Sequence, residues 1–110
     1  MEITWADFEK IDIRVGTVVD VQAFEKAKKA AFKLTIDFGE LGIKRSSAQI
    51  TALYETDVLV GKQVIAIVNF PPKQIANFIS ECLVLGVYNE QNDVVLLQAE
   101  RAVPNGSKIG

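Results

Sequence analysis

The residues best suited to hold a ligand lie in the stretch 69–86, NFPPKQIANFISECLVLG, between two apolar segments. Asn69 and Ser80 carry side chains that can hydrogen-bond phosphate oxygens or base edges, and Lys73 adds a positive charge. Proline cannot donate to a strand ladder, so Pro71–Pro72 should end the preceding strand and stiffen the chain that follows. The pattern predicts a rigid polar loop at the edge of a sheet, suited to binding.

Catalytic chemistry is poorly represented in the sequence. The chain contains no histidine, which removes the usual general base and the usual nitrogen ligand of a metal. Ser46 and Ser47 therefore have no histidine to activate them, and Cys82 has none to lower its pKa. One cysteine excludes an intrachain disulfide, and we expect its thiol to be buried and inert. The sequence predicts a non-catalytic protein without a metal or cofactor.

The charge is unevenly distributed, although the net charge is only −2. Residues 26–45 contain six basic and two acidic side chains, whereas residues 1–25 contain two basic and six acidic ones. Residues 81–100 contain four acidic side chains and no basic one. A basic segment on an otherwise acidic protein is either a docking surface for an anion or a solvated lysine-rich loop, and the charges leave both open.

The first half of the chain must position these residues on strands. Thr4 and Asp7 resemble a capping box and predict a short N-terminal helix. Residues 11–21 are rich in β-branched side chains and predict a strand, in which Gly16 indicates a bulge or bend. Residues 32–38 alternate between apolar and polar side chains, which is typical of a strand with one solvated face. Residues 43–50 predict a third, more polar strand.

The second half predicts one helix and further strands. Residues 50–60 have helical spacing and end at Gly61. Residues 64–70 are almost all apolar, which predicts a central strand covered on both faces. Residues 79–88 and 93–98 predict two more strands around a turn at 89–92. The order of these strands, with one helix between the third and fourth, indicates an all-β fold, a five-stranded OB-fold barrel with N- and C-terminal extensions; an SH3-like barrel or a β-sandwich remains the alternative.

Length and composition agree with one domain over residues 1–110. The chain is 49% hydrophobic and 24% charged, so it can bury a core without disulfides. Its apolar stretches are shorter than the roughly 20 residues needed to span a bilayer. The N-terminal residues are acidic and lack the pattern of a signal peptide. We therefore expect a cytoplasmic protein without membrane insertion.

Several motifs together resemble the tRNA-binding domain family, an OB-fold found fused to methionyl- and phenylalanyl-tRNA synthetases and as free-standing proteins. They are Asp12–Gly16, Lys33–Leu34, Asp37–Gly39, Arg45–Ser47 and Asn69–Ser80. Four further segments resemble the CsaA branch of that family, whose small dimeric members are regarded as secretion-related chaperones. They are Ser46–Ile50, Phe70–Pro72, Val94–Leu97 and Val103–Gly106.

The family resemblance implies an RNA-contacting set on one open face of the barrel: Lys33, Arg45, Ser47, Asn69, Lys73 and Ser80. The stretch after the fourth strand nevertheless departs from the family pattern. Pro71, Gln74 and Ala76 stand where basic residues are common, and Ile79 stands where the CsaA branch can be basic. Each lost phosphate contact should weaken RNA binding and flatten its salt dependence. Asn77 stands where glycine is usual, which predicts a positive φ there.

The resemblance to the CsaA branch implies two further surfaces. An exposed apolar groove beside the loop would bind exported precursor proteins or peptides through Phe70, Pro71, Phe78 and Ile79. The two terminal extensions would form the interface of a homodimer through Trp5, Phe8, Val103, Pro104 and Ile109. The implied partners are therefore precursor proteins or peptides, a second copy of the chain and, as the alternative ligand, tRNA.

Overall fold

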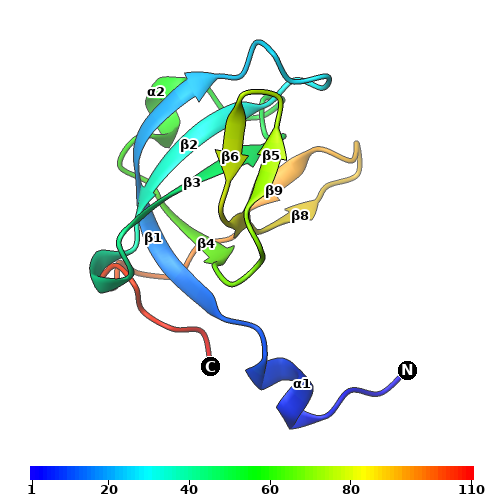
Figure 1. Ribbon diagram of the computed structural model, residues 1–110, viewed down its shortest axis with the longest axis vertical. Coiled ribbons are helices and arrows are strands. Elements are labelled where there is room, and N and C mark those ends of the chain that lie inside the picture. Colours follow the sequence, from blue (N-terminus) through cyan, green and yellow to red (C-terminus); the bar gives the residue numbers. More distant parts are fainter.

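The computed structural model describes residues 1–110, which form a barrel of antiparallel strands with short helices at its periphery (Figure 1). The α-helices are α1 (Trp5–Glu9) and α2 (Thr56–Leu59), and a 3-10 turn covers Gly39–Leu41. The strands are β1 (Ile13–Ala23), β2 (Phe32–Asp37), β3 (Ile43–Ala48), β4 (Gln63–Ile67), β5 (Lys73–Ile75), β6 (Phe78–Ser80), β7 (Leu83–Val84), β8 (Gly86–Tyr88) and β9 (Val94–Leu96).

The long strand β1 organises the main sheet, whose strand order is β3-β2-β1-β4-β7. Its first half pairs with β4 over 13–17, and its second half pairs with β2 over 17–23. Because the two partners meet different halves of one strongly curved strand, the sheet coils toward a barrel. This arrangement confirms the predicted all-β, OB-fold-like barrel with one helix between the third and fourth strands.

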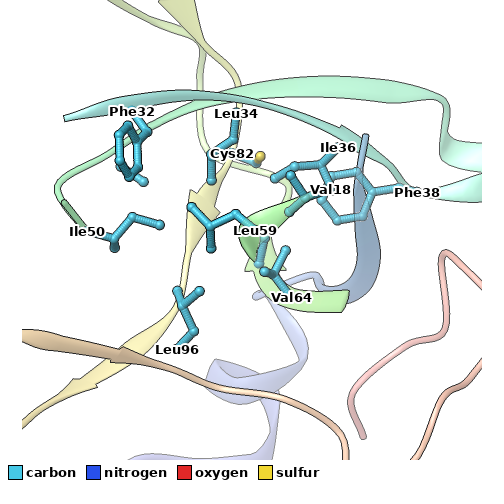
Figure 2. Packing of buried hydrophobic residues seen from close by; sticks show 12 residues of the cluster. Val18, Phe32, Leu34, Ile36, Phe38, Ile50, Leu59, Val64, Cys82 and Leu96 are labelled. Atoms are coloured by element: carbon cyan, nitrogen blue, oxygen red, sulfur yellow. The ribbon is translucent and has the colours of Figure 1, made fainter. Parts of the chain in front are cut away.

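Strand β2 confirms the predicted alternation. Phe32, Leu34 and Ile36 point inward with Phe38 just beyond the strand, and all four side chains are buried. They belong to one cluster of twelve buried residues that fills the barrel (Figure 2). Fully burying side chains of this kind contributes about 1.5–3 kcal/mol each to the free energy of folding.

The helix predicted over 50–60 is shorter than expected. Residues 51–53 form a turn, and α2 is a single turn of four residues. Leu59, which is fully buried, is the one side chain of α2 that enters the core (Figure 2). Helical spacing alone overestimated the length of the helix, because one buried leucine side chain is enough to cover this part of the barrel.

Side chains complete the barrel where the edge strand β3 meets the segment between β6 and β7. The Ser46 hydroxyl donates to the carbonyl of Cys82 over 2.8 Å, and Ser46 is the one buried polar residue. The amide of Glu81 donates to the carbonyl of Arg45 over 2.7 Å, while the amide of Arg45 donates to the Glu81 carboxylate over 3.0 Å. The polar residues that made this strand look weak in the sequence are therefore the ones that close the sheet.

The prediction of a strand over 64–70 that is covered on both faces is wrong. Strand β4 ends at Ile67, three residues before Phe70, and it buries alternate residues. Val64 and Ala66 face the core, whereas Ile65 and Ile67 are half-buried. A barrel wall has one inner face, so the outer side chains remain partly in contact with solvent. The residues after Pro72, expected to form a loop, instead build the hairpin of β5 and β6.

Gly16 does not mark the irregularity of β1. The register between β1 and β2 shifts between Val18 and Asp20, two residues farther along the strand. A Cβ on Gly16 would lie 2.7 Å from Ile36 Cγ2 and 2.7 Å from a ring carbon of Phe38. Glycine is needed here because the core packs directly against the backbone of β1.

The two ends of the chain lie near the first half of β1. The predicted capping box is confirmed, since the amide of Asp7 donates to the Thr4 hydroxyl and the amide of Thr4 donates to the Asp7 carboxylate. Helix α1 nevertheless buries no residue and projects away from the barrel (Figure 1). The C-terminal residues 106–109 run along β1, where the amide of Val15 donates to the carbonyl of Ser107. No helix has both the length and the apolar character to cross a membrane.

Candidate ligand-binding surface

A groove lies between the hairpin of β5 and β6, the Pro71–Pro72 segment and the edge strand β3. It has a volume of about 710 Å³. Its lining residues are Ser47, Gln49, Phe70, Pro71, Pro72, Lys73, Gln74, Ile75, Ser80, Glu81, Cys82 and Leu83. Figure 1 shows the hairpin standing over the outer face of the sheet beside β3. We call this feature the proline groove.

The proline groove brings together residues from both predicted binding sets. Ser47, Lys73 and Ser80 come from the predicted RNA-contacting set, and Phe70 and Pro71 come from the predicted peptide-contacting set. Phe70 is 52% exposed, so much of its ring is free to contact a ligand. The groove therefore offers an apolar rim beside a lysine, and it does so on one face of the molecule.

Ser80 has a structural task within this groove. Its hydroxyl accepts a hydrogen bond of 3.2 Å from the backbone amide of Ser47. Ser80 also pairs with Lys73 across the hairpin. The side chain thus ties the hairpin to the free edge of β3, where a neighbouring strand would otherwise supply the acceptor.

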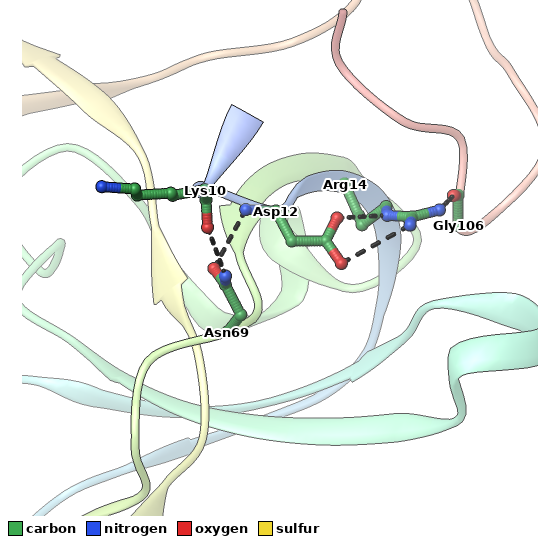
Figure 3. Close-up of polar contacts among 5 residues, drawn as sticks. All are labelled: Lys10, Asp12, Arg14, Asn69 and Gly106. Carbon is green, nitrogen blue, oxygen red and sulfur yellow. Dashed lines mark hydrogen bonds and ion pairs between the residues drawn. The ribbon is translucent and has the colours of Figure 1, made fainter. Parts of the chain in front are cut away.

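Asn69 does not line the groove, and both ends of its side-chain amide are occupied (Figure 3). Its oxygen accepts from the amide of Asp12 over 3.0 Å, and its nitrogen donates to the carbonyl of Lys10 over 2.7 Å. Asp12 in turn pairs with Arg14, whose guanidinium donates to the carbonyl of Gly106 over 3.0 Å. Asn69 therefore fastens the chain just before Pro71–Pro72 to the N-terminal arm, although the resemblance implied an RNA contact.

A second, smaller core lies under the hairpin and positions two cations. Phe24, Ala31 and Phe78 are its buried members, and the rings of Phe24 and Phe78 are 5.4 Å apart at an angle of 59°. The Lys33 ammonium lies 5.6 Å from the centre of the Phe24 ring. The Arg45 guanidinium lies 4.3 Å from the centre of the Phe78 ring. One aromatic pair therefore holds two predicted RNA-contacting cations close together.

The expectation that Phe78 helps to form an exposed apolar groove with Phe70 and Ile79 is wrong. Phe78 is 2% exposed and belongs to the second core, whereas Phe70 is 52% and Ile79 46% exposed. The alternation of the short strand β6 places Phe78 inward and Ile79 outward. The positive φ expected at Asn77 occurs one residue earlier, at Ala76, whose φ is 52°.

Phe24 is the residue of this surface that the sequence analysis missed. It lies in a lysine-rich segment, and its amide donates to the carbonyl of Ala31 over 3.0 Å, which closes the loop 24–31. A single phenylalanine between charged residues was the available signal. Lys26, Lys28 and Lys29 are exposed on this loop, so the loop extends the positive charge beyond Lys33.

Nucleophilic chemistry finds little support at this surface. Cys82 is buried, as expected, and burial raises the pKa of its thiol to about 11, which disfavours the reactive thiolate. Its carbonyl is occupied by the Ser46 hydroxyl. No group of three or more histidine, cysteine, aspartate or glutamate residues is placed to hold a metal ion.

The residues of the predicted dimer interface lie at the two ends of the chain. Trp5 is 69% exposed and its ring lies 5.3 Å from that of Phe8, so the arm displays an aromatic pair. Val103 and Ile109 are half-buried, while Pro104 is exposed. Val103 is held by Gln63, whose amide nitrogen donates to its carbonyl over 2.7 Å. The tail is thus fixed to the barrel, whereas helix α1 buries no residue against it.

Comparison with known proteins places these features in a family. A family model described as "Putative tRNA binding domain" matches residues 13–108. The chain is 36% identical over 107 residues to the methionine–tRNA ligase of Methanococcoides burtonii. Those residues make up 97% of this chain but only 16% of the ligase, so the chain spans a small part of the curated relatives that it matches.

Two solved structures resemble the chain over nearly its whole length. The chaperone CsaA from Bacillus anthracis str. Ames is 51% identical, with a TM-score of 0.94 and coverage of 100% of both chains. The CsaA chaperone protein from Picrophilus torridus is 55% identical, with a TM-score of 0.92 and coverage of 99% of this chain and 100% of that one. The chain therefore belongs to the tRNA-binding domain family, within which it is similar to the CsaA proteins.

Proposed function

We propose that this protein is a non-catalytic, cytoplasmic chaperone of the CsaA type, which holds extended segments of precursor proteins on their way to export. The observation that carries the proposal is the proline groove, where exposed Phe70 stands beside Pro71 and Lys73 at the mouth of a cavity of about 710 Å³. An apolar surface with a polar rim is typical of a site for unfolded chains. The similarity to CsaA chaperones over the whole chain supports the same function.

The test measures the aggregation of a denatured exported precursor that is diluted into buffer with an excess of this protein. We expect reduced light scattering with the native protein and weaker suppression with Phe70→Ser, because the substitution removes the largest exposed apolar group of the groove. Leu53→Ser is the matched control, since Leu53 is 47% exposed and does not line the groove. Scattering that is unchanged by excess native protein would rule out the chaperone function.

The two cations that lie over aromatic rings favour a second candidate function, the binding of tRNA. Lys33 over Phe24 and Arg45 over Phe78 lie on the outer face of neighbouring strands, with Lys33 in register with Ser47. Cations held in place lose less conformational freedom when they bind phosphate, and OB-folds bind oligonucleotides on this kind of face. The match to the tRNA-binding family model supports this candidate independently of the groove.

A titration of tRNA at several salt concentrations tests the second candidate. We expect the double variant Lys33→Ala with Lys73→Ala to bind more weakly and to have a lower salt slope, by about one for each lost phosphate contact. Lys108→Ala is the control. Lys108 pairs with Arg14 of β1, whereas Lys33 pairs with Gln22 of the same strand. These two positions are eight residues apart, which corresponds to about 26 Å along the strand. Equal affinity of the double variant and the native protein would contradict RNA binding at this surface.

We also propose that the protein acts as a homodimer. Helix α1 buries no residue of its own chain, yet it displays Trp5 beside Phe8. A second copy is the occupant that would cover this pair. Pairing of two proline grooves in one particle would strengthen binding to long unfolded chains, because the second contact becomes intramolecular.

A further inference from the structure

A slot opens in the barrel wall next to the proline groove. The seam between β3 and the β6–β7 segment is closed by hydrogen bonds as far as Ser47, and beyond it the two edges separate around a cavity of about 520 Å³. The slot is lined by residues 47–50 and 83–86, with Tyr88, Asn92 and Val94. Ser47, Gln49 and Leu83 also line the proline groove, so the two cavities are adjacent.

The chemistry of the slot is that of a strand edge on an apolar floor. Gln49 follows the last residue of β3, is exposed, and its backbone amide and carbonyl take part in none of the hydrogen bonds of the structure. The two preceding outward-facing residues of this edge, Arg45 and Ser47, have their amides satisfied by Glu81 and Ser80. The next donor and acceptor along the edge are therefore free, where a further strand would pair with them.

No lysine, arginine, aspartate or glutamate lines the slot. A phosphate backbone would find no cation there. An uncharged polypeptide needs no charged partner, and its backbone would supply the hydrogen-bond partners that the amide and carbonyl of Gln49 lack. The side chains most available to such a strand are Leu83, 47% exposed, and Tyr88, 75% exposed. The charge of the slot and its free strand edge thus select the same kind of occupant.

We propose that the slot binds an uncharged segment of the client polypeptide as an added β-strand, continuing from the proline groove along the edge at Gln49. Binding by strand addition takes its affinity from main-chain hydrogen bonds and its selectivity from alternate side chains. The client segment would therefore be extended and would carry apolar residues at alternate positions, facing Leu83 and Tyr88. This inference rests on the proposed chaperone function and specifies the conformation and composition of the segment that is bound.

Fluorescence anisotropy with a labelled, uncharged peptide of alternating valine and threonine tests the inference on the full chain. We expect saturable binding that weakens about tenfold when alternate peptide amides are N-methylated, because methylation removes the donors of an added strand. The Tyr88→Ser variant should weaken binding by a similar factor, whereas Val87→Ser should not. Val87 is the matched control because it is 52% exposed on the same hairpin but lies outside the slot.

The backbone at Gln49 provides a second comparison. Gln49→Pro removes the free amide and should weaken peptide binding, while Gln49→Ala keeps the amide and should bind as the native protein does. If the proline variant fails to fold, as judged by circular dichroism, the methylated peptide still decides the question. Equal binding of the methylated and unmodified peptides would overturn the inference. Displacement of the peptide by tRNA would also overturn it. So would a Tyr88→Ser variant that loses self-association but still binds the peptide.

The two proposals fail separately in these experiments. If the native protein suppresses precursor aggregation but does not bind the peptide, or binds both peptides equally, the slot inference is overturned and the chaperone function stands. If the peptide binds with the expected dependence on Tyr88 and on its own amides while aggregation is not suppressed, the slot is a peptide site and the chaperone function is contradicted.

Discussion

Two polar residues of the stretch 69–86 hold the fold together through hydrogen bonds. Asn69 bridges two backbone groups of the N-terminal arm, and Ser80 supplies an acceptor to the edge of β3. Both residue types can bind phosphate, which is why the sequence suggested RNA contacts. Lys73, exposed at the start of β5, is the member of this stretch that keeps its charge free for a ligand.

Asn69→Ala should lower the free energy of unfolding by about 1–2 kcal/mol, because it removes two hydrogen bonds at an exposed site. Trypsin should also cut faster after Lys10, whose carbonyl is the acceptor of the Asn69 amide. Urea denaturation and timed proteolysis measure the two effects. Asn77→Ala, at the exposed turn of the hairpin, should change neither. Unchanged cleavage at Lys10 in the Asn69 variant would show that the bridge does not hold the arm.

The reactivity of the Cys82 thiol should show whether the seam of the barrel is closed, because burial there raises the pKa of the thiol. At pH 8 iodoacetamide should alkylate the native protein slowly and the urea-unfolded chain quickly, because burial raises the pKa of the native thiol from 9.0 to about 11. The unfolded thiol ionises first, so the free energy of unfolding should fall as the pH rises from 9 toward 11. Cys82→Ala should show a smaller fall over this range. Rapid alkylation of the native protein would contradict a buried thiol.

At the scale of elements, the hairpin of β5 and β6 decides where the cations lie. It buries Phe78 against Phe24 of the lysine-rich loop, and the two rings support Arg45 and Lys33. Elements from three distant parts of the chain therefore meet at one small core. Its packing couples the loop 24–31 to the proline groove, because the same hairpin forms a wall of that groove.

Phe24→Leu should weaken tRNA binding while costing less than about 1.5 kcal/mol of stability, because leucine keeps much of the apolar volume but offers no ring to Lys33. Binding titrations and urea denaturation separate the two effects. Phe32→Leu, the same change in the main core, should affect stability without changing the affinity of the folded protein. Equal tRNA affinity of the native protein and Phe24→Leu would show that the ring does not position the cation.

At the scale of the whole molecule, β1 links the proposed dimer surface to the binding face. The arm and the C-terminal residues 106–109 lie at its first half, and the lysine-rich loop follows its last residue. Asn69 connects the arm to the chain that enters Pro71–Pro72. Association through α1 would therefore act on residues next to Lys10 and Asp12, which Asn69 ties to the chain just before Pro71–Pro72.

Trp5→Glu should convert a dimer into a monomer without lowering the stability of the isolated chain, because α1 buries nothing in its own chain. Sedimentation velocity over a range of concentrations measures the assembly state. Leu53→Glu, a charge placed on another exposed apolar position, should leave assembly unchanged. A native protein that sediments as a monomer at all concentrations would contradict the proposed homodimer.

Local patterns in the sequence determined the barrel and many of its elements. The alternation from Phe32 to Phe38, the capping box at Thr4 and the turn at 89–92 each depend on neighbouring residues, so period and turn chemistry were sufficient to predict them. The order of strands around one helix then indicated the OB-fold-like topology, which the sheet order confirms.

The tertiary structure decided which residues of the candidate site are free and which are occupied. Phe78 and Phe70 look alike in sequence, but one fills the second core and the other remains at the surface. The partners of Asn69 lie 57 and 59 residues away, and that of Ser80 lies 33 residues away. Contacts at such separations leave no local period in the sequence. The folded barrel alone determines that the side chains of Asn69 and Ser80 bond to distant backbone groups, and that Lys73 and Phe70 remain exposed beside the proline groove.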